Sequence, residues 1–182
     1  RRLLLISGLV SALALSWNPA PASAQPTPDR AAAAEAEAVI SAGDGVRLDA
    51  IALANAGCGA SCDNRDPQTF RIYYDGTRYY TCAEDAITPT LSSGYVYRTS
   101  SPLGSVELRY SPRCRTAWAR TSAGNLTFKV VSRNANGTHR MTLTADSPPS
   151  TWTRMVNDAS LEAQACYHPW GPYDGWACTR WY

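Results

Sequence analysis

The stretch that decides the fold is V-E-L-R-Y-S-P-R-C-R-T-A-W-A-R, residues Val106–Arg120. Apolar and polar side chains alternate over its first five residues, with the two-residue period of a strand that buries one face. Glu107 and Arg109 would then lie side by side on the outer face, where an exposed ion pair contributes less than about 1 kcal/mol. The sequence therefore predicts a half-buried strand here.

The second half of the stretch predicts a short helix. Ser111 is a common helix cap, and Pro112 suits the first helical position because its missing N–H needs no partner there. Cys114 and Trp118 are four residues apart, so a helix would place them on one face. Near a helix N-terminus a free Cys114 thiol would have a lowered pKa and be nucleophilic. The preferred interpretation is that Cys114 is half of a disulfide.

The start of the chain has the organisation of a secretory signal peptide. Two arginines precede an apolar run at residues 3–15, and the small residues Ala22-Ser23-Ala24 follow. The run is too short to span a membrane. We therefore expect residues 1–24 to be removed and the protein to be secreted and extracellular, with no membrane span in the mature chain. Residues 25–56 are rich in alanine and lack aromatics, which predicts a low-complexity leader, helical in part, that is either retained or removed.

The charge of the predicted mature chain excludes one class of partner. The whole chain carries 17 basic and 15 acidic side chains, and two of the arginines belong to the signal peptide. Its removal leaves a chain without net charge, which lacks the basic excess of nucleic-acid-binding proteins. We expect no nucleic-acid partner.

Six cysteines follow the leader, and an even number in an exported chain predicts three disulfides. They are Cys58, Cys62, Cys82, Cys114, Cys166 and Cys178. Spacing does not determine the pairing; Cys62 with Cys82 is a mild preference, closing a loop worth about 3 kcal/mol. Zinc is the weaker alternative because there is no C-x-x-C pair. The run D-N-R-D-P at residues 63–67 predicts an ordinary turn rather than a calcium loop, and we expect no metal and no cofactor.

The first predicted hairpin lies in residues 70–82, F-R-I-Y-Y-D-G-T-R-Y-Y-T-C, with Asp75-Gly76 as a two-residue turn. Counting outward from this turn gives a core face with Phe70, Ile72, Tyr74 and Tyr79. The opposite face then carries Arg71, Arg78, Tyr73 and Tyr80. Cation–π contacts of about 0.5–1 kcal/mol are feasible on this second face, which is either solvated or a contact surface.

The second predicted hairpin turns at Asn136-Gly137. Counting outward pairs Val130 with Leu143 and Phe128 with Ala145, all on one face. Further short strands are expected near residues 95–97, 152–156 and 161–165. The many short strands and the few helical signals predict a mainly β fold, a small disulfide-stabilised sandwich or barrel with short helical turns, formed by residues 57–182.

Several of these motifs together resemble a secreted domain family of unknown function that is common in actinobacteria. Some members of that family are the tails of helix-turn-helix regulators. The resemblance covers Cys58 to about Cys166. It is carried by C-x3-C, Asp66-Pro67, C-A-E-D-A at residues 82–86, the stretch 106–120 and T-R-M-V before Cys166. It implies a small, mostly β, disulfide-bearing domain without an established activity.

The tail after Cys166 predicts a binding surface. Residues 167–182 hold six large aromatic side chains, and interspersed glycine and proline make the segment loop-like. Exposed Trp and Tyr rings suit stacking on sugars or seating a partner protein, so we expect a non-catalytic module that binds an extracellular glycan or protein. The residues assigned to this surface are Trp170, Tyr173, Trp176, Trp181, Arg71, Arg78, Tyr73 and Tyr80. The alternative is that the tail folds back and buries its rings over the core.

Two other function classes stay open. An enzyme would use His168, with Asp174 or a reduced Cys114 beside it, whereas His139 falls on an exposed strand. No G-x-S-x-G, H-E-x-x-H or glycine-rich phosphate loop occurs, which disfavours catalysis. An exported hydrolase or protease inhibitor would present a rigid loop, either residues 112–115 or residues 170–175.

Overall fold

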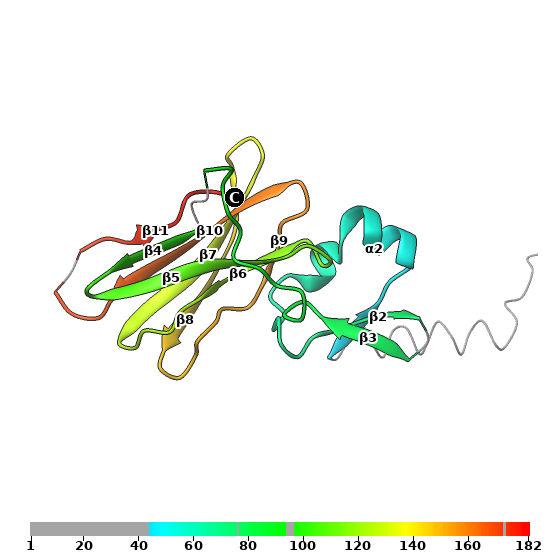
Figure 1. The fold of residues 1–182 in the computed structure, drawn as a ribbon, viewed down its shortest axis with the longest axis horizontal. Coiled ribbons are helices and arrows are strands. Elements are labelled where there is room, and N and C mark those ends of the chain that lie inside the picture. Colours follow the sequence, from blue (N-terminus) through cyan, green and yellow to red (C-terminus); the bar gives the residue numbers. More distant parts are fainter. Residues whose placement is uncertain (1–43, 76, 94–96, 173) are drawn as a thin grey trace, which may run out of the picture.

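The computed structural model describes residues 44–75, 77–93, 97–172 and 174–182. The predicted signal peptide and residues 25–43 lie outside these ranges, as do Gly76, Tyr95 and Tyr173. The described chain is mainly β and forms two four-stranded sheets and one three-stranded sheet (Figure 1). Among the described residues, no helix has the length and apolar character needed to cross a membrane.

The deciding stretch forms the middle of one four-stranded sheet, in the order β4-β5-β6-β9. Its strands are β4 (Arg98–Ser101), β5 (Gly104–Ser111), β6 (Thr116–Arg120) and β9 (Val156–Asn157). The predicted strand is confirmed as β5, but the predicted helix is wrong because the chain turns at residues 112–115 and returns as β6. Ser111 Oγ accepts a hydrogen bond from the Cys114 N–H at 3.0 Å, as a helix cap would. Arg115 then takes a left-handed φ of 53°, which ends the turn.

The other four-stranded sheet has the order β11-β10-β7-β8. Its strands are β7 (Leu126–Asn134), β8 (His139–Ser147), β10 (Leu161–Pro169) and β11 (Ala177–Cys178). The predicted pairs Val130–Leu143 and Phe128–Ala145 are both confirmed in the β7–β8 hairpin. The Asn-Gly turn and the apolar pattern agree there, so the register has one solution.

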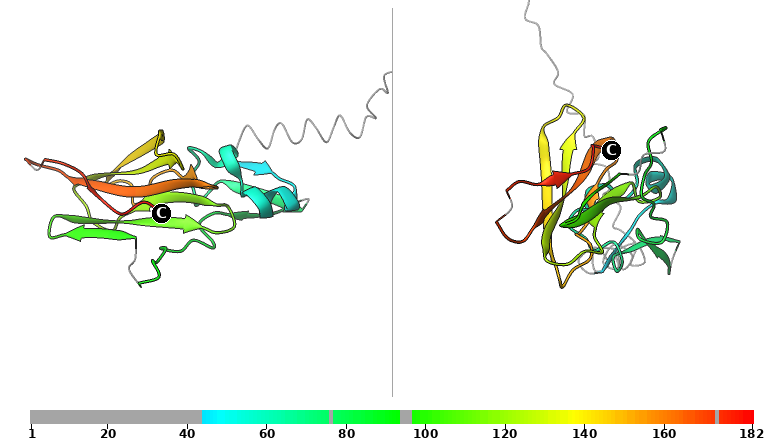
Figure 2. Two further views of the ribbon diagram at one scale, coloured as in Figure 1. Left: turned by 90° about the horizontal axis from the view of Figure 1, so that it is seen from above. Right: turned by 60° about the vertical axis from the view of Figure 1, so that its left-hand side comes forward.

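These two sheets pack face to face, as the two views of Figure 2 show. Alternate apolar side chains from both sheets fill the space between them, including Val106 and Leu108 from β5 and Phe128 and Val130 from β7. The prediction of a sandwich or barrel is therefore confirmed as a sandwich. Polar residues between these positions, such as Glu107 and Lys129, lie on the outer faces.

A smaller lobe lies at one end of the sandwich (Figure 1). It holds β1 (Gly45–Arg47), α2 (Ala50–Ala56), the 3-10 turn η1 (Gly59–Cys62), β2 (Arg71–Asp75) and β3 (Arg78–Thr81). β1 pairs with β2 in parallel. Val46 and Leu53 are buried in a second core with Ile72 and Trp118, so residues 44–56, which the sequence assigned to the leader, contribute to the folded structure.

The predicted register of the β2–β3 hairpin is wrong by one residue. Ile72 pairs with Tyr80 and Tyr73 with Tyr79, and a bulge at Tyr74 takes up the extra residue before Asp75 pairs with Arg78. A one-residue slip moves side chains to the opposite face. Tyr80 is therefore core, at 3% exposure, and Tyr79 is 46% exposed, the reverse of the prediction.

The six cysteines form three disulfides, as the sequence predicted. The pairs are Cys58–Cys62, Cys82–Cys114 and Cys166–Cys178. The preferred pair Cys62–Cys82 is therefore wrong, although both residues lie in the same cluster. The sulfurs of Cys58, Cys82 and Cys114 lie within 4.8 Å of one another, so two disulfides stack in the second core.

Candidate functional site

The predicted binding residues lie at two separate places. The arginines and tyrosines of the β2–β3 hairpin belong to the small lobe, whereas the tail that carries the tryptophans runs along the sandwich next to β10 (Figure 1). The structure therefore does not bring these two groups together into one surface. Tyr173 lies outside the described residues.

The hairpin surface is held by contacts within the hairpin itself. The Arg71 guanidinium lies 4.8 Å from the centre of the Tyr79 ring, and Tyr79 packs at 5.4 Å against Tyr73. Arg78 forms an exposed ion pair with Asp75 at 3.8 Å. Tyr80 does not belong to this surface, because its ring is buried. The cation–π contact predicted for the hairpin is therefore made by Tyr79 instead of Tyr80.

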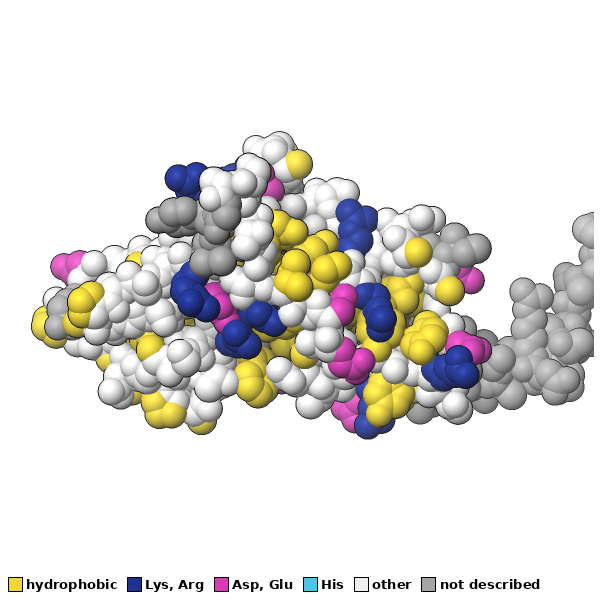
Figure 3. Space-filling view, in the orientation of Figure 1, with side chains coloured by type: hydrophobic (Ala, Val, Ile, Leu, Met, Phe, Trp, Pro, Cys, Tyr) yellow, Lys and Arg dark blue, Asp and Glu magenta, His cyan; other side chains and the backbone are white. Residues whose placement is uncertain are grey.

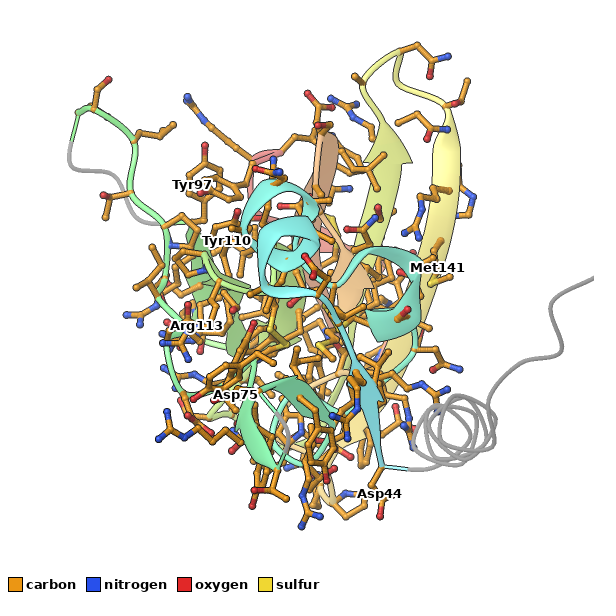
Figure 4. The ribbon with its side chains drawn as sticks, turned by 90° about the vertical axis from the view of Figure 1, so that its right-hand side faces the viewer. Asp44, Asp75, Tyr97, Tyr110, Arg113 and Met141 are labelled. Atoms are coloured by element: carbon orange, nitrogen blue, oxygen red, sulfur yellow. A yellow bond between two sulfur atoms is a disulfide. The ribbon has the colours of Figure 1, made fainter. Side chains whose placement is uncertain are left out.

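Tyr80 is covered by the turn between β5 and β6. The guanidinium of Arg113, from that turn, lies 4.3 Å from the centre of the Tyr80 ring. In Figure 4, Arg113 and the hairpin residue Asp75 lie on the same side of the molecule. Burial raises the pKa of the Tyr80 hydroxyl above its usual value. The hydroxyl is buried without a hydrogen-bond partner among the described residues. Tyr80 is therefore a packing residue.

The tail extends the β7–β10 sheet as an edge. Thr179 N–H donates to Ala165 O at 2.8 Å, and Ala163 and Tyr182 exchange two backbone hydrogen bonds of 2.9 and 3.1 Å. The disulfide Cys166–Cys178 joins the same two segments. Because the tail is paired in this way, its side chains point to opposite faces of the sheet.

Three tryptophans of the tail lie along the outer face of β7 and are called the tryptophan face: Trp170, Trp176 and Trp181. Trp170 Nε1 donates a hydrogen bond to Thr127 Oγ1 at 3.1 Å. The Lys129 amine lies 3.7 Å from the centre of the Trp176 ring, and the Arg133 guanidinium lies 3.9 Å from that of Trp181. Thus alternate positions of one strand hold all three rings.

The tryptophan face is open to solvent at two of its three rings. Trp170 and Trp176 are 47% and 41% exposed, and Trp181 is half-buried. Lys129 is partly buried beneath Trp176, and this burial lowers the pKa of its amine. Arg133 also pairs with Glu162 of β10. Trp176 and Trp181 are thus held by cations and Trp170 by a hydrogen bond, and part of the rings of Trp170 and Trp176 remains open to solvent.

Other aromatic rings of the tail do cover the core. Tyr182 packs edge-on against Tyr97 at 5.1 Å and Tyr110 at 4.9 Å, two side chains that lie close together in Figure 4. Tyr167 is 2% exposed. The tail therefore divides: its tyrosines 167 and 182 close the sandwich, and its tryptophans lie outside.

Three of the residues considered for catalysis lie at different places: Cys114 in the second core, His168 on β10 and His139 on β8. The Cys114 sulfur is bonded to Cys82 and 0% exposed, so the nucleophile alternative is wrong for this structure. The His168 ring is half-buried and lies 5.6 Å from the Trp176 ring. The ring of His139 is exposed and forms a hydrogen bond of 3.0 Å with Thr142. His168 thus belongs to the surroundings of the tryptophan face.

Sequence reasoning missed a row of charged side chains across the other sheet. Glu107 is paired with Arg98 on one neighbouring strand and with Arg120 on the other, and it is only 6% exposed. The predicted exposed pair Glu107–Arg109 is therefore wrong. Arg109 instead donates to Thr88 Oγ1 at 2.9 Å and to Ala86 O. The alternating pattern of residues 106–110 predicted which side chains of β5 face outward. It did not indicate which strands would pair with β5.

Comparison with known proteins identifies a family and nothing narrower. The model of the family described as "Protein of unknown function (DUF2690)" matches residues 60–166, more than half of the chain. No curated protein and no solved structure matches the chain. The predicted kinship with a family of unknown function is thereby confirmed; its secreted character and actinobacterial origin remain predictions. The chain belongs to the DUF2690 family.

Proposed function

We propose that the protein is a secreted, non-catalytic module that binds an extracellular glycan through the tryptophan face. The observation that carries the proposal is that Trp170, Trp176 and Trp181 of the tail all contact side chains of one strand, β7. Two of these rings are more than 40% exposed. Soluble proteins seldom leave several large rings together in solvent unless the patch contacts a partner.

The shape of the surface favours a polymer. The side chains that hold the rings are Thr127, Lys129 and Arg133. The first and last of them lie six steps apart along β7, which at the rise of a strand is about 20 Å. A row of flat rings of this length fits an extended chain better than a small molecule in a pocket. The polar ring edges and the nearby His168 suit the hydroxyl groups of sugars.

The covalent framework supports action outside the cell. All six cysteines are paired in three disulfides, which persist in oxidising compartments. The signal peptide predicted at residues 1–24 points to the same compartment. Secretion therefore agrees with a glycan of the cell surface or its surroundings as the ligand.

Retention on insoluble glycans tests the proposal. The purified, disulfide-bonded protein is incubated with bacterial cell wall, chitin or cellulose, and the unbound fraction is measured. We expect Trp176→Ala and Trp170→Ala each to weaken retention about tenfold, the loss of one stacked ring. Tyr79→Ala, which removes an equally exposed ring from the small lobe, is the matched control. Equal retention of all three variants and the parent, or no retention on any polymer, would refute the glycan function.

A further inference from the structure

A cleft of about 560 Å³ lies on the other outer face of the sandwich, over β4, β5 and β6. Its lining includes Arg98, Arg120 and Trp152 and the hydroxyl-bearing residues Ser105, Ser122 and Thr151. Figure 3 views this face and shows basic side chains gathered over the middle of the sheet. The tryptophan face lies on the opposite sheet, so the two surfaces are independent.

The floor of the cleft is built by strand register. Arg98, Glu107 and Arg120 are direct neighbours across β4, β5 and β6. Glu107 Oε2 accepts hydrogen bonds from Arg98 Nη2 at 2.7 Å and from Thr88 Oγ1 at 3.1 Å, while Arg120 binds the other oxygen. Both carboxylate oxygens are therefore occupied, and the buried Glu107 holds the two guanidiniums in fixed positions.

The cleft carries more positive than negative charge. Its lining holds two guanidiniums, those of Arg98 and Arg120, against the single carboxylate of Glu107. Arg109 lies two residues from Glu107 on the same face of β5, outside the lining, and donates to Thr88 and Ala86. Burial lowers the pKa of Arg109, and the neighbouring charge of Arg120 lowers it further. Asp66 lies nearby, but it lines the adjacent cleft and accepts hydrogen bonds from Trp152 Nε1 and the Gln68 N–H. The two guanidiniums of the lining thus share one carboxylate, which leaves an excess of positive charge.

The guanidiniums remain accessible from solvent. The side chains of Arg98 and Arg120 are 53% and 48% exposed, although the carboxylate between them is buried. Each guanidinium has five N–H donors in a planar fork, and Glu107 uses only part of each set. The remaining donors match the oxygens of a second oxyanion. The hydroxyls around them and the Trp152 ring suit a body rich in hydroxyl groups.

We propose that this cleft is an oxyanion site for acidic sugars. The oxyanion binds Arg98 and Arg120, and the sugar body contacts the hydroxyls of Ser122 and Thr151 and the side chain of Trp152. Carboxylate and phosphate groups share the required chemistry, because both accept paired hydrogen bonds from guanidinium. The site is separate from the tryptophan face and stands whether or not that face binds a glycan.

Titration with matched sugars tests the site. Galacturonate, galactose 1-phosphate and galactose are added separately to isotope-labelled protein, and the dissociation constant is obtained from the shifts of backbone resonances. We expect the two charged sugars to shift residues of β4, β5 and β6 and galactose to bind at least tenfold more weakly, since it lacks the charged hydrogen bonds. Binding weakens as salt is added. The tighter of the two charged sugars identifies the source as a uronate or a phosphorylated glycan.

Substitutions that remove either a positive or a negative charge from the cleft complete the test. Arg98→Gln should weaken binding about tenfold while Arg120 still satisfies Glu107, and Arg98→Lys should restore part of the loss. Glu107→Gln should tighten binding, because it removes the negative charge that competes with the ligand. Arg78→Gln, on the small lobe, is the matched control and should change nothing. Equal binding of galactose and the charged sugars, or unchanged binding in both Arg98→Gln and Glu107→Gln, would overturn the proposal.

Discussion

At the scale of single residues, Asp158 is a carboxyl group that the fold keeps away from water. It is 8% exposed, and its Oδ1 is buried without a hydrogen-bond partner among the described residues. Burial raises the pKa of Asp158 to about 8, and the charge of Glu162 adds to this, against the opposing effects of Arg115 and Arg140. Near neutral pH the folded protein therefore holds a proton on Asp158.

This proton makes stability depend on pH. An unfolded Asp has a pKa of about 3.9, so between about pH 4 and pH 8 the folded state binds more protons than the unfolded state. The free energy of unfolding therefore falls as pH rises through this window. Asp158→Asn, neutral at every pH, should remove this slope and be more stable than the parent at pH 8 by roughly 2–5 kcal/mol.

Urea unfolding from pH 4 to pH 9 measures the effect. The two proteins should converge near pH 4, where Asp158 is protonated in both states of the parent. Asp75→Asn, an exposed carboxyl on the hairpin, is the control and should follow the parent curve. A parent curve parallel to that of Asp158→Asn across the whole range would contradict the raised pKa.

At the scale of elements, the Cys82–Cys114 disulfide joins the small lobe to the sandwich. Cys82 follows β3, and Cys114 lies in the turn between β5 and β6. Its sequence separation of 32 is the largest of the three pairs, against 4 for Cys58–Cys62. In the chain-entropy account, a longer closed loop restricts the unfolded state more.

Paired alanine substitutions should therefore rank the disulfides. Removing Cys82 and Cys114 together should cost about 4 kcal/mol, and removing Cys58 and Cys62 together about 2 kcal/mol, both measured by urea unfolding. Because each pair is buried in the same core, the cavities left behind are comparable. A larger loss from the Cys58–Cys62 pair would show that loop length does not govern the order.

The two hairpins show what sequence can predict about register. At Asn136-Gly137 the turn residues and the apolar pattern favour the same pairing, and the structure has that pairing. The turn predicted at Asp75-Gly76 is misplaced, because Asp75 is the last residue of β2 and pairs with Arg78, and the bulge at Tyr74 shifts the pairs beyond it once more. Both strands carry Tyr and Arg side chains that give no clear apolar face, so the pattern could not exclude the wrong register.

The tryptophan face and the arginine-lined cleft also differ in how far the sequence could predict them. The tryptophans are close together in the sequence, so composition alone indicated a surface. Arg98, Glu107 and Arg120 come from three strands, and only the pairing of β4 and β6 with β5 brings them together. Local alternation predicted outward-facing charges on β5 and assigned Glu107 the wrong partner, Arg109. Long-range pairing is set by packing of the whole sandwich, which no short pattern contains.

At the scale of the whole molecule, the sandwich and the small lobe each have a hydrophobic core. The second core is closed on one side by β1 and α2, through Val46 and Leu53. On the other side it is closed by Trp118 of β6, so the two lobes share side chains. The folded unit therefore includes residues that precede the predicted boundary at residue 57.

Two truncated chains test where the folded unit begins. A chain starting at Asp44 keeps β1 and α2, whereas one starting at Gly57 lacks them and exposes the core around Ile72. Burying a side chain such as Val or Leu contributes about 1.5–3 kcal/mol, so the loss of Val46 and Leu53 alone should cost the shorter chain about 3–5 kcal/mol in unfolding free energy.

The shorter chain should also bind a hydrophobic dye, because Ile72 and Phe70 lose their cover. Among the described residues, the buried side chains of the β7–β10 sheet belong to the first core and those of β1 and α2 to the second, so retention on glycans should be equal in the two chains wherever both are folded. Equal unfolding free energies would instead mean that residues 44–56 lie on the surface of the second core without stabilising it.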